Sequence, residues 1–290
     1  MKHKRVVLLL AVLAASLLLV TSLAAILMDD GGMPHEFVGV MGNTVEVYGG
    51  HGIYQYDSVY KAVMFRGFDW LSLVGIVPLF VLGIRLFRQG KLKGQLLLAS
   101  LFTYLAYIYL IGVMGNMFNI LFLAWTGLFS LGLFGLIFTI RDIKIEELPQ
   151  KLGAFFPRKG VAVYVMSLGG LLLVQYLIQI IGANAAALPP AALEQYTTLE
   201  LAALELGLMV PFHGMGGILL WKNNAWGYLM ATVLAFAAAT VFVALNIALF
   251  MLALIYNQGT LAGNVMPMLI MLVAGGFSIR IFSQGKGELA

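Results

Sequence analysis

IVPLFVLGIRLFRQGKLKGQLLL, residues 76–98, consists of two apolar runs joined by a short basic turn. The turn carries Arg85, Arg88, Lys91 and Lys93. This pattern is typical of two membrane helices with a cytoplasmic loop between them, because basic residues favour the cytoplasmic side of a bilayer. The stretch therefore indicates a chain that crosses a membrane.

The composition of the chain supports this interpretation. Hydrophobic residues make up 61% of the 290 residues, charged residues make up 10%, and the mean hydropathy is +0.96. Soluble domains usually carry about 25% charged residues, so these values indicate a polytopic membrane protein. The apolar runs are continuous rather than alternating, which favours helices over a β-barrel.

The number of crossings follows from the length of the apolar runs. A helix needs about 20 apolar residues to cross about 30 Å of hydrocarbon. Eight such runs occur, at residues 6–28, 70–88, 94–113, 118–140, 160–182, 199–221, 226–256 and 262–282. The predicted fold is an all-α membrane protein with eight transmembrane helices.

The distribution of basic residues predicts the orientation. If the N-terminus is cytoplasmic and each run crosses once, both termini and fifteen of the 17 basic residues lie in the cytoplasm. These fifteen are Lys2, Lys4, Arg5, Arg85, Arg88, Lys91, Lys93, Arg141, Lys144, Lys151, Arg158, Lys159, Lys222, Arg280 and Lys286. Lys61 and Arg66 are the two exceptions. The net charge of +4 is thus a signal of topology, and we expect no nucleic-acid partner.

A second stretch, MVPFHGMGGILLWKNNAWGYLMA at residues 209–231, matches the first in the spacing of its prolines and glycines. The matching pairs are Pro78 with Pro211, Gly83 with Gly216 and Gly94 with Gly227. We interpret residues 1–150 and 151–290 as two four-helix halves in the same orientation, related by an axis along the membrane normal. The alternative is chance, since proline and glycine are common in membrane helices.

The longest polar segment, residues 29–67, lies between the first two crossings. Its TVEVY and GIYQY sequences flank the glycine-rich residues 49–52, which predicts a small hairpin on the outer surface. Asp57 is a good N-cap for an amphipathic surface helix that turns at Gly67 into the second crossing. We expect residues 43–70, which we call the lid, to cover an outward-facing cavity between the halves.

The candidate ligand-binding residues are polar groups at or inside the membrane, where a central charge costs at least about 2.5 kcal/mol. They are Glu205, Asp69, Arg66, His213 and Glu200. Arg66, Asp69 and Glu205 are predicted to converge beneath the lid, and His213 follows Glu205 on nearly the same helical face. Alternatively, Asp69 caps its helix and pairs with Arg66, Glu200 touches water, and His213 forms a hydrogen bond between helices.

Missing residues and motifs also limit the function. The chain has no cysteine, so thiol chemistry and cysteine-ligated metals are excluded. It has no GxxxxGK[ST] loop, so an ATP-driven cycle would need an ATPase partner chain. The four histidines are dispersed, and we expect no bound metal and no cofactor.

Four stretches of the chain carry a family resemblance. They are YGGHGIYQYDSVYKA (48–62), RGFDWLSLVGIVPL (66–79), YLIGVMGNMFNILFLAW (109–125) and LELGLMVPFHGMGGILLWKNNAWGYLMA (204–231). In this order they resemble a family of uncharacterised bacterial polytopic membrane proteins of unknown function. The resemblance implies a bacterial cytoplasmic (inner) membrane, and it brings no activity, cofactor or binding residues.

Three functions remain open. A transporter-like or permease-like protein with a cavity for a small ligand is favoured by the predicted repeat, by Glu205 and by the proline in the sixth crossing. A non-catalytic subunit or sensor would use the outer segment to dock a partner. A membrane-embedded enzyme would act on a lipid-like substrate with the outer acids as acid and base, although no paired-carboxylate motif is present.

Overall fold

The computed structural model of the protein describes residues 2–152 and 156–283. Within these ranges, eight helical spans are long and apolar enough to cross a membrane. This confirms the prediction of a largely helical, polytopic membrane protein. Lys286, which was assigned to the cytoplasmic side, lies outside the described residues.

The first four spans are α1 (Lys4–Leu27), α2 with α3 (Val59–Leu71 and Val77–Arg88), α4 (Leu92–Gly115) and α5 (Phe122–Asp142). The last four are α7 (Arg158–Ala186), α8 with α9 (Glu200–Leu204 and Val210–Trp221), α10 (Ala225–Ile255) and α11 (Val265–Ser283). The shorter elements are β1 (His35–Val38), β2 (Thr44–Val47), α6 (Leu148–Leu152) and 3₁₀ turns at Ile145–Glu147, Ala191–Leu193 and Leu261–Asn264.

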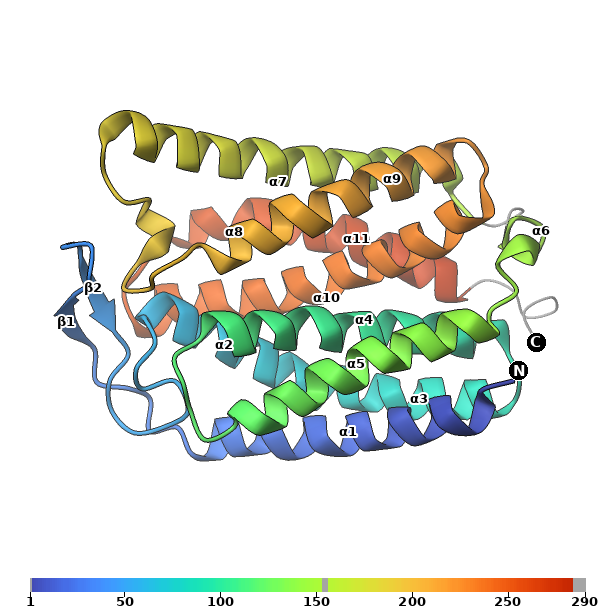
Figure 1. Ribbon diagram of the computed structural model, residues 1–290, viewed down its shortest axis with the longest axis horizontal. Coiled ribbons are helices and arrows are strands. Elements are labelled where there is room, and N and C mark those ends of the chain that lie inside the picture. Colours follow the sequence, from blue (N-terminus) through green and yellow to red (C-terminus); the bar gives the residue numbers. More distant parts are fainter. Residues whose placement is uncertain (1, 153–155, 284–290) are drawn as a thin grey trace.

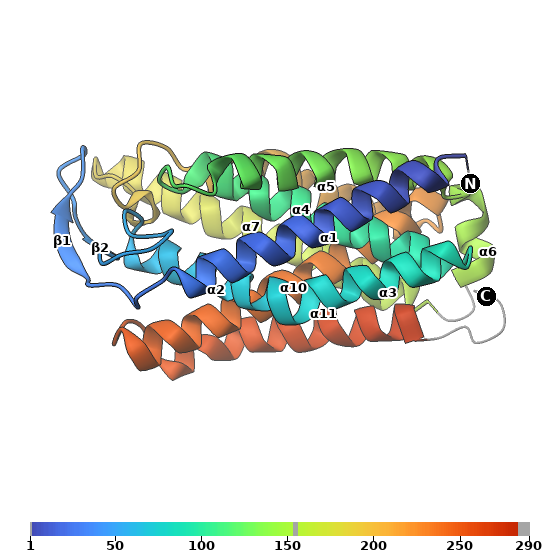
Figure 2. The ribbon, with the colours of Figure 1, turned by 90° about the horizontal axis from the view of Figure 1, so that it is seen from below.

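The spans lie side by side, and α4 and α10 occupy the middle of the bundle (Figure 1). α4 packs against α3, α5 and α10, whereas α10 packs against α2, α9 and α11. α1 begins and α11 ends at the same end of the bundle, as an even number of crossings requires. The two strands lie beyond the opposite end, which we call the outer end, in both views (Figure 1, Figure 2).

Two of the eight spans are interrupted at corresponding places. A π-helical turn, Ser72–Ile76, joins α2 to α3, and Pro78 follows it. A second π-helical turn, Glu205–Met209, joins α8 to α9, and Pro211 follows it. The second turn and its proline lie 133 residues after the first, so that residue 72 corresponds to residue 205 and Pro78 to Pro211. Proline has no N–H to donate and disturbs the preceding helical turn, which accounts for the irregular backbone at both places.

The loops that follow these two spans also correspond under the same shift. Gly90 and Asn223 both have left-handed backbones, with φ of 78° and 61°. The Gly90 N–H donates to the Phe87 carbonyl at 3.0 Å, and the Asn223 N–H donates to the Leu220 carbonyl at 2.9 Å. A left-handed residue reverses the chain after a helix, so both turns lead directly into the next span.

The predicted outer hairpin has the wrong pairing. β2 was expected to pair with residues 52–56, but it pairs antiparallel with β1, so that Val38 faces Thr44. Gly49 and Gly50 have positive φ and turn the chain away from the sheet. Tyr54 is buried, which draws the following residues down against the helices instead of leaving them as an exposed strand.

The predicted start and bend of the next helix are also wrong. Ser58, not Asp57, is the N-cap, and its hydroxyl accepts a hydrogen bond from the Lys61 N–H at 3.1 Å. The helix does not turn at Gly67 but continues through the π-helical turn to Arg88. Gly67 permits close packing, because a Cβ there would overlap the backbone of Ala244 in α10.

Candidate functional site

Arg66 is held at the outer end of the bundle by a buried ion pair. Its Nε lies 2.7 Å from Asp29 Oδ2, and the Asp29 side chain is 2% exposed. Its Nη1 donates to the hydroxyls of Tyr48 at 2.7 Å and Tyr256 at 2.9 Å. Arg66 thereby ties the lid to the ends of α1 and α10. The ion pair that was expected between Arg66 and Asp69 or Glu205 is instead formed with Asp29.

Asp69 lies inside α2 and does not cap it. Its Oδ2 accepts a hydrogen bond from the hydroxyl of Tyr54 at 2.6 Å, and both side chains are buried. The Tyr54 ring also stacks on Trp125 of α5, with ring centres 6.0 Å apart. Asp69 therefore fixes the part of the lid that the hairpin prediction misplaced.

Lys61 and Glu200 connect the two predicted halves at the outer end. Lys61 Nζ lies 2.6 Å from Glu200 Oε1, and it donates to the Gly115 carbonyl at 2.7 Å. The ammonium group also lies 3.6 Å from the centre of the Tyr196 ring. Glu200 is 8% exposed, so its carboxylate depends on Lys61 more than on water for a partner.

Asp57 forms a second connection between the halves. Its carboxylate accepts hydrogen bonds from the Met117 N–H and the Tyr196 hydroxyl, each at 2.8 Å. The neighbouring Ser58 hydroxyl donates to Glu194 Oε2 at 2.6 Å. We call the contacts Lys61–Glu200, Asp57–Tyr196 and Ser58–Glu194 the outer gate.

Asp57 and Glu194 are the two carboxyl groups of the gate that lie outside the spans, and both have a raised pKa. Burial raises the pKa of Asp57 to about 6, although its hydrogen bonds and the nearby charge of Lys61 act in the opposite direction. Burial also raises the pKa of Glu194 above its ordinary value. A carboxyl group with a raised pKa in the folded state is destabilising once it ionises.

This predicts a pH dependence of stability that Asp57→Asn removes. Asp57 has an ordinary pKa of 3.8, so between about pH 4 and pH 6 the folded state holds a proton that the unfolded state has released. The free energy of unfolding should therefore fall as the pH rises through this window, by about 3 kcal/mol for a shift of this size. Chemical unfolding of both proteins from pH 4 to pH 7 measures the difference. A constant difference would contradict the assignment to Asp57.

Glu205 is the first residue of the second π-helical turn and contacts tyrosines from two other helices. Its Oε1 accepts a hydrogen bond from the Tyr107 hydroxyl of α4 at 2.6 Å. The hydroxyl of Tyr176 in α7 lies near this carboxyl group. At the corresponding position of the first π-helical turn, the Ser72 hydroxyl lies 3.0 Å from the Tyr104 hydroxyl of α4. Both interruptions thus meet polar groups of the same central helix.

His213 is separate from this cluster. It is buried, its Nδ1 lies 2.7 Å from the Met209 carbonyl oxygen in the preceding turn, and its Cβ packs against Gly169 of α7. The hydrogen bond lies within its own span, so the expected bond between helices is replaced by packing between them.

The sequence reasoning missed several residues of the outer network. Asp29, Asp57, Glu194 and Tyr196 were not candidates, yet each binds a charged or polar group across the fold. The predicted topology gave one signal that could have found the acidic partners. Lys61 and Arg66 are the two basic residues on the predicted outer side, so each of them needed an acidic partner.

No group of three His, Asp or Glu side chains in the described part of the chain is placed to hold a metal ion. No family model, curated protein or solved structure matches the chain.

Proposed function

We propose that the protein is a transporter-like membrane protein that carries a small polar ligand between two four-helix halves, residues 1–150 and 151–290. The supporting observation is the pair of interruptions at Ser72–Ile76 and Glu205–Met209. Transporters built from repeats place their substrate sites where corresponding helices of the two halves are broken. Irregular backbone at membrane depth is tolerated where it lines a protein cavity.

Glu205 is the proposed ligand-binding group. It accepts a hydrogen bond from Tyr107 of the first half and lies near Tyr176 of its own half, so a ligand that replaces the Tyr107 phenol would loosen the contact between the halves. The exposed amides of Gln175 and Gln179 lie on α7 beside Tyr176. Polar amides are unfavourable against lipid, which supports a hydrated path along this side of α7.

The outer gate closes this path in the proposed cycle. Its three contacts join the lid and α2 to the segment that enters α8, and two of its acidic groups are buried. We further propose that the gate faces the exterior of a bacterial inner membrane and that both termini are cytoplasmic. The charge bias and the family resemblance described above support this orientation.

Cysteine labelling tests the path directly, because the chain contains no cysteine. Gln175→Cys and Gln179→Cys are labelled in intact cells with a membrane-impermeant maleimide, with and without Lys61→Gln and Glu200→Gln. We expect labelling to be at least about tenfold faster in the gate variant, because the neutral side chains lose the ion pair of the gate.

Three positions serve as controls. His51→Cys in the lid should be labelled in every background, and Lys151→Cys should be labelled only after lysis. Ile178→Cys, an exposed apolar position of α7 assigned to lipid, should stay unlabelled. If positions 175 and 179 stay as unreactive as 178 with the gate neutralised, the α7 path is absent and the transporter proposal fails.

One observation favours the docking subunit as a second candidate. The β1–β2 hairpin exposes four large apolar side chains at and near its tip: Phe37, Val38, Val40 and Met41. Exposed apolar patches commonly mark interaction sites. Failure of the labelling experiment would therefore favour a protein that binds a partner through this tip.

A further inference from the structure

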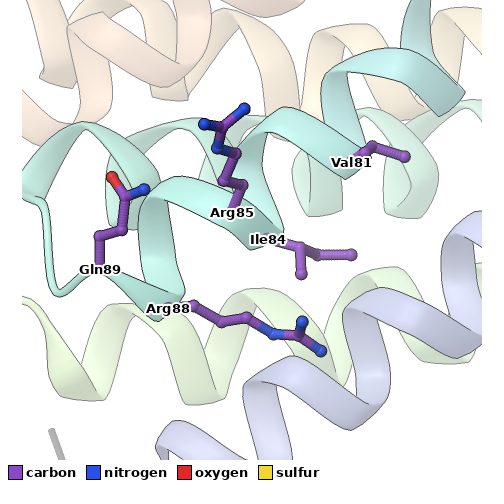
Figure 3. A pocket seen from close by; sticks show the side chains of 5 residues that line it. All are labelled: Val81, Ile84, Arg85, Arg88 and Gln89. Atoms are coloured by element: carbon purple, nitrogen blue, oxygen red, sulfur yellow. The ribbon is translucent and has the colours of Figure 1, made fainter.

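We propose that the cytoplasmic end of α3 binds the phosphate group of an anionic phospholipid. The pocket there has a volume of about 350 Å³ and is lined by Val81, Ile84, Arg85, Arg88 and Gln89 (Figure 3). Pockets of this size bind small ligands. The inference concerns a surface far from the outer gate and does not rest on the proposed transport.

The charges of the pocket are suited to a phosphate. Within the described residues, the guanidinium groups of Arg85 and Arg88 have no hydrogen-bond or ion-pair partner. Figure 3 shows them extending to different sides of α3, with Arg88 directed towards α1; both residues are exposed, so the two side chains can turn towards one phosphate between them. Lys4 of α1 donates to the Arg88 carbonyl at 2.9 Å, which brings a third cation to the same end. Guanidinium groups bind phosphate oxygens with paired hydrogen bonds.

The depth of the pocket favours a lipid over a soluble phosphate compound. Arg88 is the last residue of its span, so the arginines lie at the level of the headgroups. Ile84 and Val81 lie about one and two turns further into the membrane than Arg88, and Val81 is exposed. A bound phosphodiester would therefore have cations around its oxygens and apolar side chains beside its acyl chains.

The second half lacks these groups, although its backbone corresponds closely. Under the shift of 133 residues, Arg85 and Arg88 correspond to Ile218 and Trp221. Lys222 corresponds to Gln89 and is the basic residue of that turn. A general preference of cations for the cytoplasmic side would act equally at the end of α3 and at the end of α9. Lys222, at the end of α9, therefore provides the control for Arg85 and Arg88.

Native mass spectrometry of the purified full chain tests the inference. Phosphatidylglycerol and phosphatidylcholine are added in detergent to wild type, to R85Q/R88Q and to K222Q. We expect wild type to bind the anionic lipid at least about tenfold more tightly than the zwitterionic one. R85Q/R88Q should lose most of this preference and K222Q should keep it. R85K/R88K, which keeps the charges without the guanidinium geometry, should be intermediate and provides the comparison if the glutamine variant fails to fold.

A competition experiment distinguishes the phosphate of a lipid from that of a soluble compound. Millimolar inorganic phosphate or glycerol phosphate should leave phosphatidylglycerol bound, because neither has acyl chains to contact Val81 and Ile84. If soluble phosphate displaces the lipid, the lipid assignment is overturned in favour of a soluble ligand. Equal binding of both lipids, or equal losses in R85Q/R88Q and K222Q, would also overturn it, since the arginines would then act only as topological anchors.

Discussion

Gly227→Ala is expected to lower the free energy of unfolding by about 3 kcal/mol, and Gly94→Ala should have a similar effect. A Cβ at Gly227 would overlap the backbone of Leu219 and Leu220, and a Cβ at Gly94 would overlap that of Leu86 and Phe87. A backbone cannot move aside as a flexible side chain can, so the two helices must separate. Thermal unfolding in detergent measures the loss.

Gly170→Ala is the control for both variants. Gly170 lies within α7 and has no atom within 4 Å of an added Cβ. Alanine is the better helix former by about 1 kcal/mol, so this variant should be as stable as wild type or slightly more stable. If Gly227→Ala unfolds at the same temperature as Gly170→Ala, the close approach of α9 and α10 at their loop is wrong. Similar losses at Gly94 and Gly227 would support the proposed repeat.

Arg66→Met is expected to destabilise the protein by about 3–5 kcal/mol. The substitution leaves the carboxylate of Asp29 buried without its counter-charge and removes a donor to Tyr48 and Tyr256. The double variant Arg66→Met with Asp29→Asn should recover at least half of this loss, because no unpaired charge remains. Unfolding of the two single variants and the double variant gives the coupling between the residues.

A surface ion pair provides the comparison for Arg66. Lys151 pairs with Glu147 at 2.8 Å, and their side chains are 43% and 37% exposed. Solvent screens such a pair, so Lys151→Met should leave stability nearly unchanged. If Arg66→Met is equally harmless, or if the double variant is no more stable than Arg66→Met alone, the ion pair does not hold the lid.

The membrane spans could be predicted from the sequence because their determinants are local. Hydropathy over about 20 residues defines each run. The main error was in the second span, which begins at Val59 instead of near residue 70. Its first turns carry Lys61 and Arg66, so hydropathy assigns them to the surface. The structure extends the helix there because buried partners neutralise both charges.

The site residues depended on contacts that the sequence does not encode locally. Arg66 was paired with Asp69 because one helical turn separates them, but its partner Asp29 lies at the end of another helix. Asp57 and Ser58 are both good N-caps, and burial of Asp57 against Met117 and Tyr196 leaves the capping to Ser58. Such choices depend on packing between different segments of the chain, such as Asp57 and Tyr196, which are 139 residues apart.

Because α2 continues into α3 through a π-helical turn, a tilt at that turn would move the whole outer part of the span. Lys61 lies 13 residues before the centre of the π-helical turn Ser72–Ile76, a distance of about 20 Å along the axis. A tilt of about 10° at that turn would displace Lys61 by roughly 3 Å, given this arm length. A displacement of this size away from Glu200 would end the 2.6 Å contact between Lys61 and Glu200. A small rotation at membrane depth would thereby be amplified into a broken contact at the surface, without any bending of the lid itself.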